Sequence, residues 1–250
     1  MDSKPLPDPK TFYNETMPKK IGSDYEHARW HADEIREAGF QMTKDAIERH
    51  LFDALPGFSP SSVLEIGPGV GTWTKLLLER VPGTSLDLVD ISAEMLRRAK
   101  LALPTEAHIR YFEGDFLAWS PDRKYQLFFS SRAVEYVGDK SAFIRGLRET
   151  MEPGAVGFII TKMPHHWRWW LLRRKFAIFH QWQMPPLVFA QLLAEGGFSD
   201  VETYVSTVNV PFFNVPWINM LAYRLFCNMP LNFISAAFAE SYCVRFRKSL

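Results

Sequence analysis

Residues 63–71 read VLEIGPGVG, and this stretch decides the fold class of the chain. A mostly apolar run precedes three glycines at alternate positions, Gly67, Gly69 and Gly71. An apolar run that meets glycines in this way indicates a buried strand entering a tight turn. Because glycine adopts backbone conformations that other residues resist, such a turn also lets a ligand approach the main chain.

Strands and helices are predicted to alternate on either side of this turn. Apolar runs predict strands at 62–66, 85–89, 109–112, 125–129, 157–161, 201–210 and 242–247, and helical spacing predicts helices at 72–80, 92–101, 140–151 and 185–195. This order predicts an α/β fold with a mostly parallel sheet covered on both faces. Helix-prone stretches at 25–40 and 43–55 precede it, and residues 1–10, with four charges and three prolines, predict a loose tail.

An acidic residue, Asp90, stands at the end of the strand that follows the glycine turn. In nucleotide-binding α/β folds an acid at this place accepts hydrogen bonds from ribose hydroxyls. The dinucleotide fingerprint would need glycine where Thr72 stands, which disfavours a nicotinamide-dependent oxidoreductase. Glu65, two residues before the first glycine, would repel a pyrophosphate and suits a ligand with a cationic ammonium and sulfonium.

The spacing E-x-G-x-G-x-G followed by Asp90 resembles the first motifs of the class I, Rossmann-like methyltransferases. The resemblance is good over roughly residues 60–165. It implies a seven-stranded sheet in one domain, with a loose tail (1–10), an N-terminal helical cap (11–58), a cofactor-binding core (59–165) and substrate-cap elements with the last strands (166–250). The implied cofactor is S-adenosylmethionine, held by Glu65, Gly67, Pro68, Gly69, Gly71, Asp90, Ile91, Gly114, Asp115, Phe116, Ser131 and Arg132.

Two of these assignments carry a specific role. Asp115 matches the acid that contacts the adenine amino group, and Ser131 and Arg132 fall where the fourth strand opens onto the active site. Arg132 either contacts the ligand or forms an ion pair with Glu135 at a helix start, and the sequence leaves these two alternatives open.

Motifs that are absent narrow the acceptor. The N/D-P-P-Y/F loop of adenine-amine methyltransferases is missing after the fourth strand, where 130–133 read SSRA. Cys227 and Cys243 lie in apolar segments, which favours structural roles over a nucleophile for pyrimidine methylation. No acid stands among residues 128–134, so a metal-dependent catechol-type site is not expected. The formal charge of +1 supplies no field for a nucleic acid backbone, and no nucleic acid partner is expected.

The candidate general bases are histidines. A hydroxyl acceptor needs a base, whereas an amine needs only to be neutral. His165 and His166 follow the fifth strand, at the edge of the sheet that faces the ligand crevice. His27 and His31 lie on the N-terminal helix. For each of these histidines a surface or packing role is the alternative.

Two aromatic segments suggest an apolar acceptor. Residues 167–176, WRWWLLRRKF, combine three tryptophans with four cations, which fits a helix packed on the sheet, a lid over an apolar pocket or a membrane-interface helix. Residues 212–239 carry only Arg224 as a charge, and prolines interrupt them too often for a membrane span. Their length suggests a second cap over the acceptor.

These features predict metal-independent methyl transfer to oxygen or nitrogen of a small or lipid-like acceptor. The expected location is the cytoplasm, because no secretory signal is recognisable, with weak contact to a membrane surface. The alternatives are a catalytically silent methyltransferase-like scaffold subunit and a nucleic acid or protein methyltransferase. The oligomeric state stays open.

Overall fold

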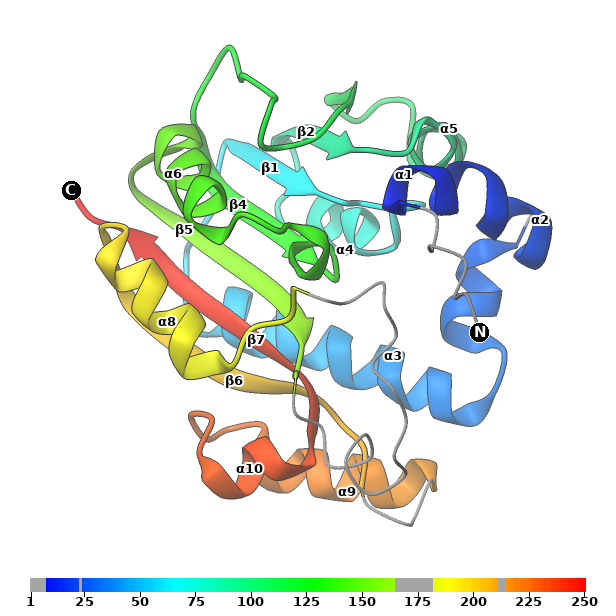
Figure 1. The fold of residues 1–250 in the computed structure, drawn as a ribbon, viewed down its shortest axis with the longest axis vertical. Helices are drawn as coiled ribbons and strands as arrows, with labels where there is room; N and C mark the ends of the chain where they lie inside the picture. The colour runs from blue at the N-terminus through cyan, green and yellow to red at the C-terminus, as the bar shows by residue number, and fades with distance from the viewer. Residues whose placement is uncertain (1–7, 23, 165–181, 211–214) are drawn as a thin grey trace, which may run out of the picture.

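The computed structural model describes residues 8–22, 24–164, 182–210 and 215–250. These residues form a seven-stranded sheet in the order β3-β2-β1-β4-β5-β7-β6, in which β7 alone is antiparallel to its neighbours (Figure 1). The strands are β1 (Ser62–Ile66), β2 (Ser85–Asp90), β3 (Ile109–Glu113), β4 (Tyr125–Ser131), β5 (Met151–Lys162), β6 (Phe198–Val208) and β7 (Ala239–Lys248). The prediction of an α/β fold with a mostly parallel seven-stranded sheet is confirmed.

The strand order reverses at β1, because β2 and β3 lie on one side of it and β4 and β5 on the other. Strand β1 pairs in parallel with β2 on one side and with β4 on the other, so the connections after these strands leave in opposite directions. All five residues of β1 are buried, including the polar Ser62 and Glu65, as expected for a central strand covered on both faces. In open α/β sheets, ligands bind at the carboxyl ends of the strands beside such a switch point.

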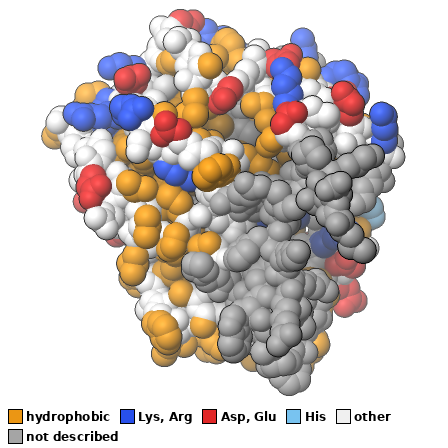
Figure 2. All heavy atoms as spheres, viewed as in Figure 1, with side chains coloured by type: hydrophobic (Ala, Val, Ile, Leu, Met, Phe, Trp, Pro, Cys, Tyr) orange, Lys and Arg blue, Asp and Glu red, His pale blue; other side chains and the backbone are white. Residues whose placement is uncertain are grey.

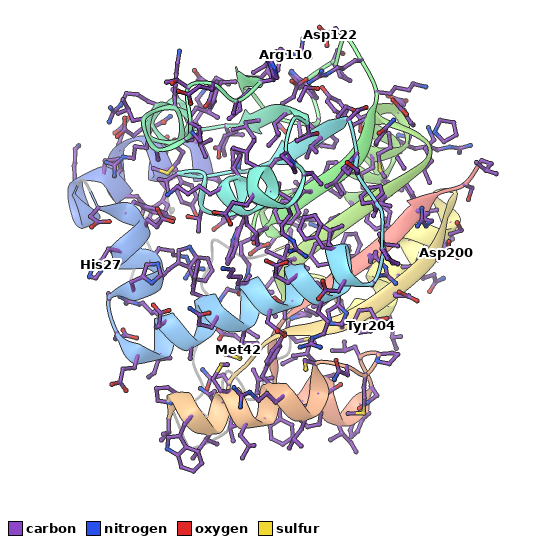
Figure 3. All side chains as sticks on the ribbon, turned by 180° about the vertical axis from the view of Figure 1, so that it is seen from behind. His27, Met42, Arg110, Asp122, Asp200 and Tyr204 are labelled. Atoms are coloured by element: carbon purple, nitrogen blue, oxygen red, sulfur yellow. The ribbon has the colours of Figure 1, made fainter. Side chains whose placement is uncertain are left out.

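Helices cover both faces of the sheet. The longer helices are α3 (Glu34–Ile47), α4 (Thr72–Arg80), α5 (Ala93–Ala102), α6 (Lys140–Thr150), α8 (Pro186–Glu195) and α9 (Pro216–Phe226). Their buried side chains divide between two hydrophobic clusters, with α4 and α5 in one cluster and α6 and α8 in the other. In Figure 3, which shows the molecule from behind, α3 crosses in front of the sheet with α9 beside it.

Helix α5 illustrates how the sequence specifies one of these elements. The Ser92 side chain caps the helix by accepting a hydrogen bond from the Met95 amide at 3.2 Å. Met95, Leu96 and Ala99 are buried, as their helical spacing predicts. The helix thereby fixes the chain immediately after Asp90.

The N-terminal segment is more ordered than its composition suggests. Asp8 caps a short helix, α1 (Pro9–Thr11), by accepting a hydrogen bond from the Thr11 amide at 3.1 Å. A π-helical turn, η1 (Phe12–Thr16), and helix α2 (Met17–Ile21) continue it. The predicted loose tail is therefore wrong for residues 8–10, because a cap and tertiary contacts order them; residues 1–7 lie outside the described part.

The two helices expected at 25–40 and 43–55 divide at a different place. A π-helical turn, η2 (His27–His31), ends before Asp33, which caps α3 through the Arg36 amide at 2.9 Å. Helix α3 then continues into η3 (Glu48–Asp53) without a break. Thr43, expected as a helix start, lies within α3 and donates its hydroxyl to the Gly39 carbonyl at 2.7 Å.

The fifth strand also begins earlier than predicted. Helix α6 ends at Thr150, and β5 starts at Met151, so the Pro153–Gly154 pair lies inside the strand. The pairing with β4 shifts register between Tyr125 and Leu127. This irregularity accommodates the proline, which lacks a ladder hydrogen bond.

The late apolar segment forms α9 and a short helix, α10 (Phe233–Phe238). Helix α9 packs against α3 and β6 and leaves Trp217, Leu221 and Leu225 more than half exposed. Figure 2 shows hydrophobic side chains gathered over the lower part of the molecule, where α8 and α10 lie. Among the described residues, no helix is long and apolar enough to cross a membrane.

Candidate functional site

A pocket of ≈ 640 Å³ opens at the carboxyl ends of β1, β2, β4 and β5. Its wall combines the loops after these strands with the N-terminal segment, which folds back over them. From the strand side it is lined by Ile66, Gly67, Pro68, Gly69, Val89, Asp90, Ile91, Gly114, Asp115, Phe116, Leu117, Ser131, Arg132, Ala133, Glu135, Tyr136, Val137, Gly138 and Lys162. The pocket therefore lies at the switch point of the sheet.

The glycine turn forms the floor of this pocket. Gly67 has φ +66°, and a Cβ atom there would lie 2.4 Å from the Cβ atom of Ala133. Gly69 has φ +58°, but a Cβ atom there would meet nothing within 4 Å. Gly67 is thus required by packing as well as by backbone conformation, whereas Gly69 presents bare backbone to the open pocket.

Asp90 lies beside this turn at the end of β2. Its carboxylate accepts hydrogen bonds from the Ser92 amide at 2.9 Å and from the Gly69 amide at 3.3 Å. Burial raises the pKa of Asp90 to about 6, against the effect of these two bonds. The carboxylate is held at the pocket wall with lone pairs left over for a further donor.

Glu65 and Gly71 are the two predicted cofactor residues that do not line the pocket. Glu65 is buried behind the turn and accepts a hydrogen bond from the Thr74 hydroxyl of α4 at 2.7 Å. Burial raises the pKa of Glu65 to about 8. Gly71 begins α4, and a Cβ atom there would lie 3.1 Å from Leu103. Both residues connect the turn to the helix that follows it.

The predicted adenine side of the pocket follows β3. Asp115 is exposed and accepts a hydrogen bond from the Leu117 amide at 2.9 Å. Phe116 is buried and packs edge-on against Phe143 of α6. The loop is therefore anchored by Phe116, which leaves the Asp115 carboxylate at the pocket.

Arg132 and Glu135 lie at the other end of the pocket, after β4. Arg132 has φ +61°, which is uncommon for a residue other than glycine. Its Nε atom is buried without a hydrogen-bond partner, and burial lowers the pKa of Arg132. Glu135 is buried and accepts a hydrogen bond from the Thr161 hydroxyl at 3.0 Å. Within the described residues the two form no ion pair, so that alternative for Arg132 is wrong.

The N-terminal segment closes the pocket and supplies residues that the sequence did not single out. Tyr13, Tyr25 and Arg29 line the pocket from this side. The Tyr13 hydroxyl lies 2.9 Å from that of Tyr136, which also lines the pocket. These side chains reach the site because a segment far away in sequence folds back over it. No local sequence motif predicts this contact.

The segment is held by polar contacts to the Asp90 side of the site. Asn14 accepts hydrogen bonds from the Ser92 hydroxyl at 2.7 Å and from the Glu94 amide at 3.2 Å. Lys10 forms an ion pair with Glu113 at 2.8 Å. The predicted N-terminal cap thus lies over the pocket.

The predicted bases and cysteines have different outcomes. His165 and His166 lie outside the described residues. His27 and His31 do not line the pocket, and His31 pairs with Glu37, so a packing role fits both. Cys227 and Cys243 are buried, as expected for structural cysteines. In the described part of the chain, no cluster of three or more His, Cys, Asp or Glu side chains could hold a metal ion.

Residues 63–154 match the family model described as a methyltransferase domain. Among curated proteins, the chain is 30% identical over 137 residues to trans-aconitate 2-methyltransferase of Rhodopseudomonas palustris, covering 55% of this chain and 51% of that protein. It is 28% identical over 115 residues to malonyl-[acyl-carrier protein] O-methyltransferase 2 of Ilyobacter polytropus, covering 44% of each. The chain spans about half the length of these curated relatives.

Solved structures agree with the fold. The N-methyltransferase NodS of Bradyrhizobium japonicum, in complex with S-adenosyl-L-homocysteine, matches with a TM-score of 0.60 at 15% identity, over 94% of this chain and 98% of that chain. Phosphoethanolamine N-methyltransferase 2 of Haemonchus contortus, in complex with S-adenosyl-L-methionine, matches with a TM-score of 0.66 at 13% identity, over 100% of this chain and 62% of that chain. At these identities the likeness concerns the fold alone.

Proposed function

We propose that this chain, which matches a methyltransferase domain over residues 63–154, is a class I S-adenosylmethionine-dependent methyltransferase that transfers a methyl group to a small-molecule acceptor. The observation that carries the proposal is the placement of Asp90 beside the bare backbone of Gly69, at the switch point of the sheet. An acid and an exposed glycine turn at this place suit a ribose and the chain attached to it.

Several residues in and behind the pocket have a proposed part in holding the cofactor. Asp90 accepts hydrogen bonds from the ribose hydroxyls, which are the further donors that its carboxylate can satisfy. Asp115 lies at the adenine end, and Ile91 and Phe116 supply apolar surface there. Glu65 supports the site indirectly, because its buried carboxylate holds Thr74 of α4 behind the turn. This differs from the direct contact that its position in the motif suggests.

Bound S-adenosylmethionine would supply the electrophile, a methyl carbon on a sulfonium. The chain then has to hold the acceptor atom in line with that carbon and exclude water. The N-terminal segment closes the pocket mouth through Tyr13 and Tyr136. Because the sulfonium is already an activated leaving group, we propose that transfer to oxygen or nitrogen proceeds without a metal ion.

The acceptor that we propose is polar, in contrast to the lipid-like acceptor expected from the aromatic segments. None of the residues of α9 or α10 lines the pocket, and the tryptophan–arginine stretch at 167–176 lies outside the described residues. The wall beyond the cofactor residues instead carries charged groups, including Arg29, Glu135 and Lys162. Two relatives are named for trans-aconitate and malonyl-[acyl-carrier protein], which supports an acceptor other than a lipid.

Calorimetry with S-adenosylhomocysteine and with NAD tests the cofactor assignment. We expect S-adenosylhomocysteine to bind and NAD not to bind. A second measurement follows transfer of labelled methyl groups from S-adenosylmethionine to a set of small acids and amines. Failure to bind S-adenosylhomocysteine would refute the proposal, and binding without transfer to any acceptor would favour a silent scaffold subunit.

A further inference from the structure

Two arginines line one end of the pocket without a carboxylate partner. Arg29 comes from η2 in the N-terminal segment, and Arg132 follows β4. Neither forms an ion pair with another described residue. The Arg29 guanidinium lies 4.3 Å from the centre of the Trp30 ring, which supports its apolar face. Both cations are therefore available to an anion that enters the pocket.

One donor of Arg132 has no hydrogen-bond partner within the described residues. Its Nε atom is buried and unpartnered, and both its burial and the charge of Arg29 lower the pKa of Arg132. Its backbone has φ +61°, a conformation that costs energy for a residue with a side chain. A buried donor without a partner is unfavourable, although the charges of Glu135 and Glu240 partly compensate the half-buried guanidinium. An entering carboxylate would relieve this cost.

The surrounding charges leave this end of the pocket positive. Lys162, at the end of β5, also lines the pocket and pairs with Glu240 at 3.2 Å. Glu135 is the acid on this part of the wall, and one of its oxygens accepts from Thr161. The other oxygen of Glu135 is buried without a hydrogen-bond partner, and the charge of Glu135 partly offsets that of Arg132. Because Glu240 offsets Lys162, two arginines face one glutamate and a net positive charge remains. The hydroxyls of Tyr13, Tyr25 and Tyr136 border the same space.

The strand order separates this end from the proposed cofactor residues. The loops after β1, β2 and β3 carry the glycine turn, Asp90 and Asp115. Arg132 and Lys162 follow β4 and β5, which come next across the sheet (Figure 1). A molecule bound over β4 and β5 would thus lie beside a cofactor bound over β1 to β3.

We propose that this end of the pocket binds a carboxylate of the methyl acceptor, with Arg132 as its main partner and Arg29 as the second. The acceptor is therefore a small organic acid that carries a carboxylate. The inference rests on the methyltransferase function proposed above. Arginine suits this role because its planar guanidinium binds a carboxylate through two parallel hydrogen bonds.

The methionine part of the cofactor also carries a carboxylate, so the experiment has to separate the two sources. Calorimetry first measures the dissociation constants of S-adenosylhomocysteine and of its decarboxylated analogue for the wild-type chain and for Arg132→Gln. Trans-aconitate, a tricarboxylate, and its uncharged trimethyl ester are then titrated into protein saturated with S-adenosylhomocysteine. The further variants are Arg132→Lys, Arg29→Gln and the control Arg97→Gln, which removes an exposed cation of α5 outside the pocket.

We expect trans-aconitate to bind the saturated wild-type chain and the ester not to bind. Arg132→Gln should raise the dissociation constant of trans-aconitate at least tenfold, and Arg132→Lys should raise it less. Arg29→Gln should also weaken binding, and Arg97→Gln should leave it unchanged. The affinity for S-adenosylhomocysteine should stay within about twofold in Arg132→Gln. Circular dichroism checks that each variant is folded. If Arg132→Gln does not fold, Arg29→Gln tests the site in its place.

Two results would overturn the inference. The first is that trans-aconitate does not bind the saturated wild-type chain, or binds no better than its ester. The second is that Arg132→Gln weakens S-adenosylhomocysteine but not its decarboxylated analogue, which would assign the arginine to the cofactor. If the wild-type chain does not bind S-adenosylhomocysteine at all, the proposed function fails before the acceptor is tested.

Discussion

Alanine substitutions at Gly67 and Gly69 should separate the packing role of the glycine turn from its binding role. Both glycines have similar positive φ angles, +66° and +58°, so each alanine carries a similar backbone cost of about 1 kcal/mol. Only at Gly67 does the new Cβ atom collide with a neighbour, at 2.4 Å from the Cβ atom of Ala133. Overpacking of this kind costs a further ~1–3 kcal/mol.

Gly67→Ala should therefore lower the free energy of unfolding by about 2–4 kcal/mol, and Gly69→Ala by about 1 kcal/mol. At Gly69 the added methyl group points into the open pocket, so this variant should lose affinity for S-adenosylhomocysteine while it stays folded. Urea unfolding measures the first quantity, and calorimetry measures the second.

The double variant Gly67→Ala, Ala133→Gly provides the control. Removing the Ala133 Cβ atom eliminates the collision but leaves the backbone strain at position 67. Stability should then return to within about 1–2 kcal/mol of the value for Ala133→Gly alone. Equal losses of stability in Gly67→Ala and Gly69→Ala, or no recovery in the double variant, would refute the assignment of the 2.4 Å contact as the cause.

Three further predictions concern single side chains. Asp90→Asn should weaken S-adenosylhomocysteine binding by roughly tenfold to a hundredfold, because a hydrogen bond to a charged acceptor is worth about 1.5–3 kcal/mol. The control in the same calorimetric measurement is Asp122→Asn, which lies beside Arg110 at the far edge of the molecule (Figure 3) and should bind as the wild type does. Since the pKa of Asp90 is raised to about 6, the wild-type affinity should fall as the pH drops below 6, and this pH dependence should be absent from Asp90→Asn. Burial lowers the pKa of His50 to about 4, so on acidification His50 is protonated in the unfolded state before it is protonated in the folded state. The free energy of unfolding should therefore fall between about pH 6.5 and pH 4. Urea unfolding of His50→Gln should show a smaller fall over this range, and an unchanged dependence on pH would contradict the prediction. Tyr13→Phe should cost about 1 kcal/mol or less of stability and should increase the hydrogen exchange of the N-terminal segment, because one hydrogen bond to Tyr136 is lost; unchanged exchange would show that the bond does not hold the segment.

The cofactor half of the site was predictable because it is local in sequence. The strand–turn–helix unit at 63–71 and the acid at the end of the next strand are specified by residues that lie close along the chain. The parallel sheet then brings Gly69 and Asp90 within hydrogen-bond distance, as that pattern requires. The motif gives the order of residues but not the direction of a side chain. Glu65 binds Thr74 behind the turn and does not line the pocket, so its direct contact with the cofactor stays a prediction.

The cover of the pocket could not be predicted in the same way. The composition of residues 1–10 resembles a disordered tail, yet the cap at Asp8 and the ion pair of Lys10 with Glu113 order residues 8–10. Both depend on a partner or a local geometry that composition does not record. The break between the first helices was misplaced for a related reason, since the Asp33 cap lies inside a stretch whose apolar spacing looked continuous.

The acceptor half of the site depends most on tertiary structure, and this explains why an apolar acceptor was expected. Residues 212–239 are apolar, but the buried face of α9 packs against α3 and β6, and no residue of α9 lines the pocket. The charged residues that do line this end, Arg29 and Lys162, are far apart in sequence. Neither residue belongs to a recognisable motif in its own segment. The fold brings both to the wall of the same pocket. Polarity at a pocket built in this way is a property of the assembled fold. Our proposal for the acceptor class therefore starts from the charged groups that line the pocket rather than from the average hydropathy of neighbouring segments.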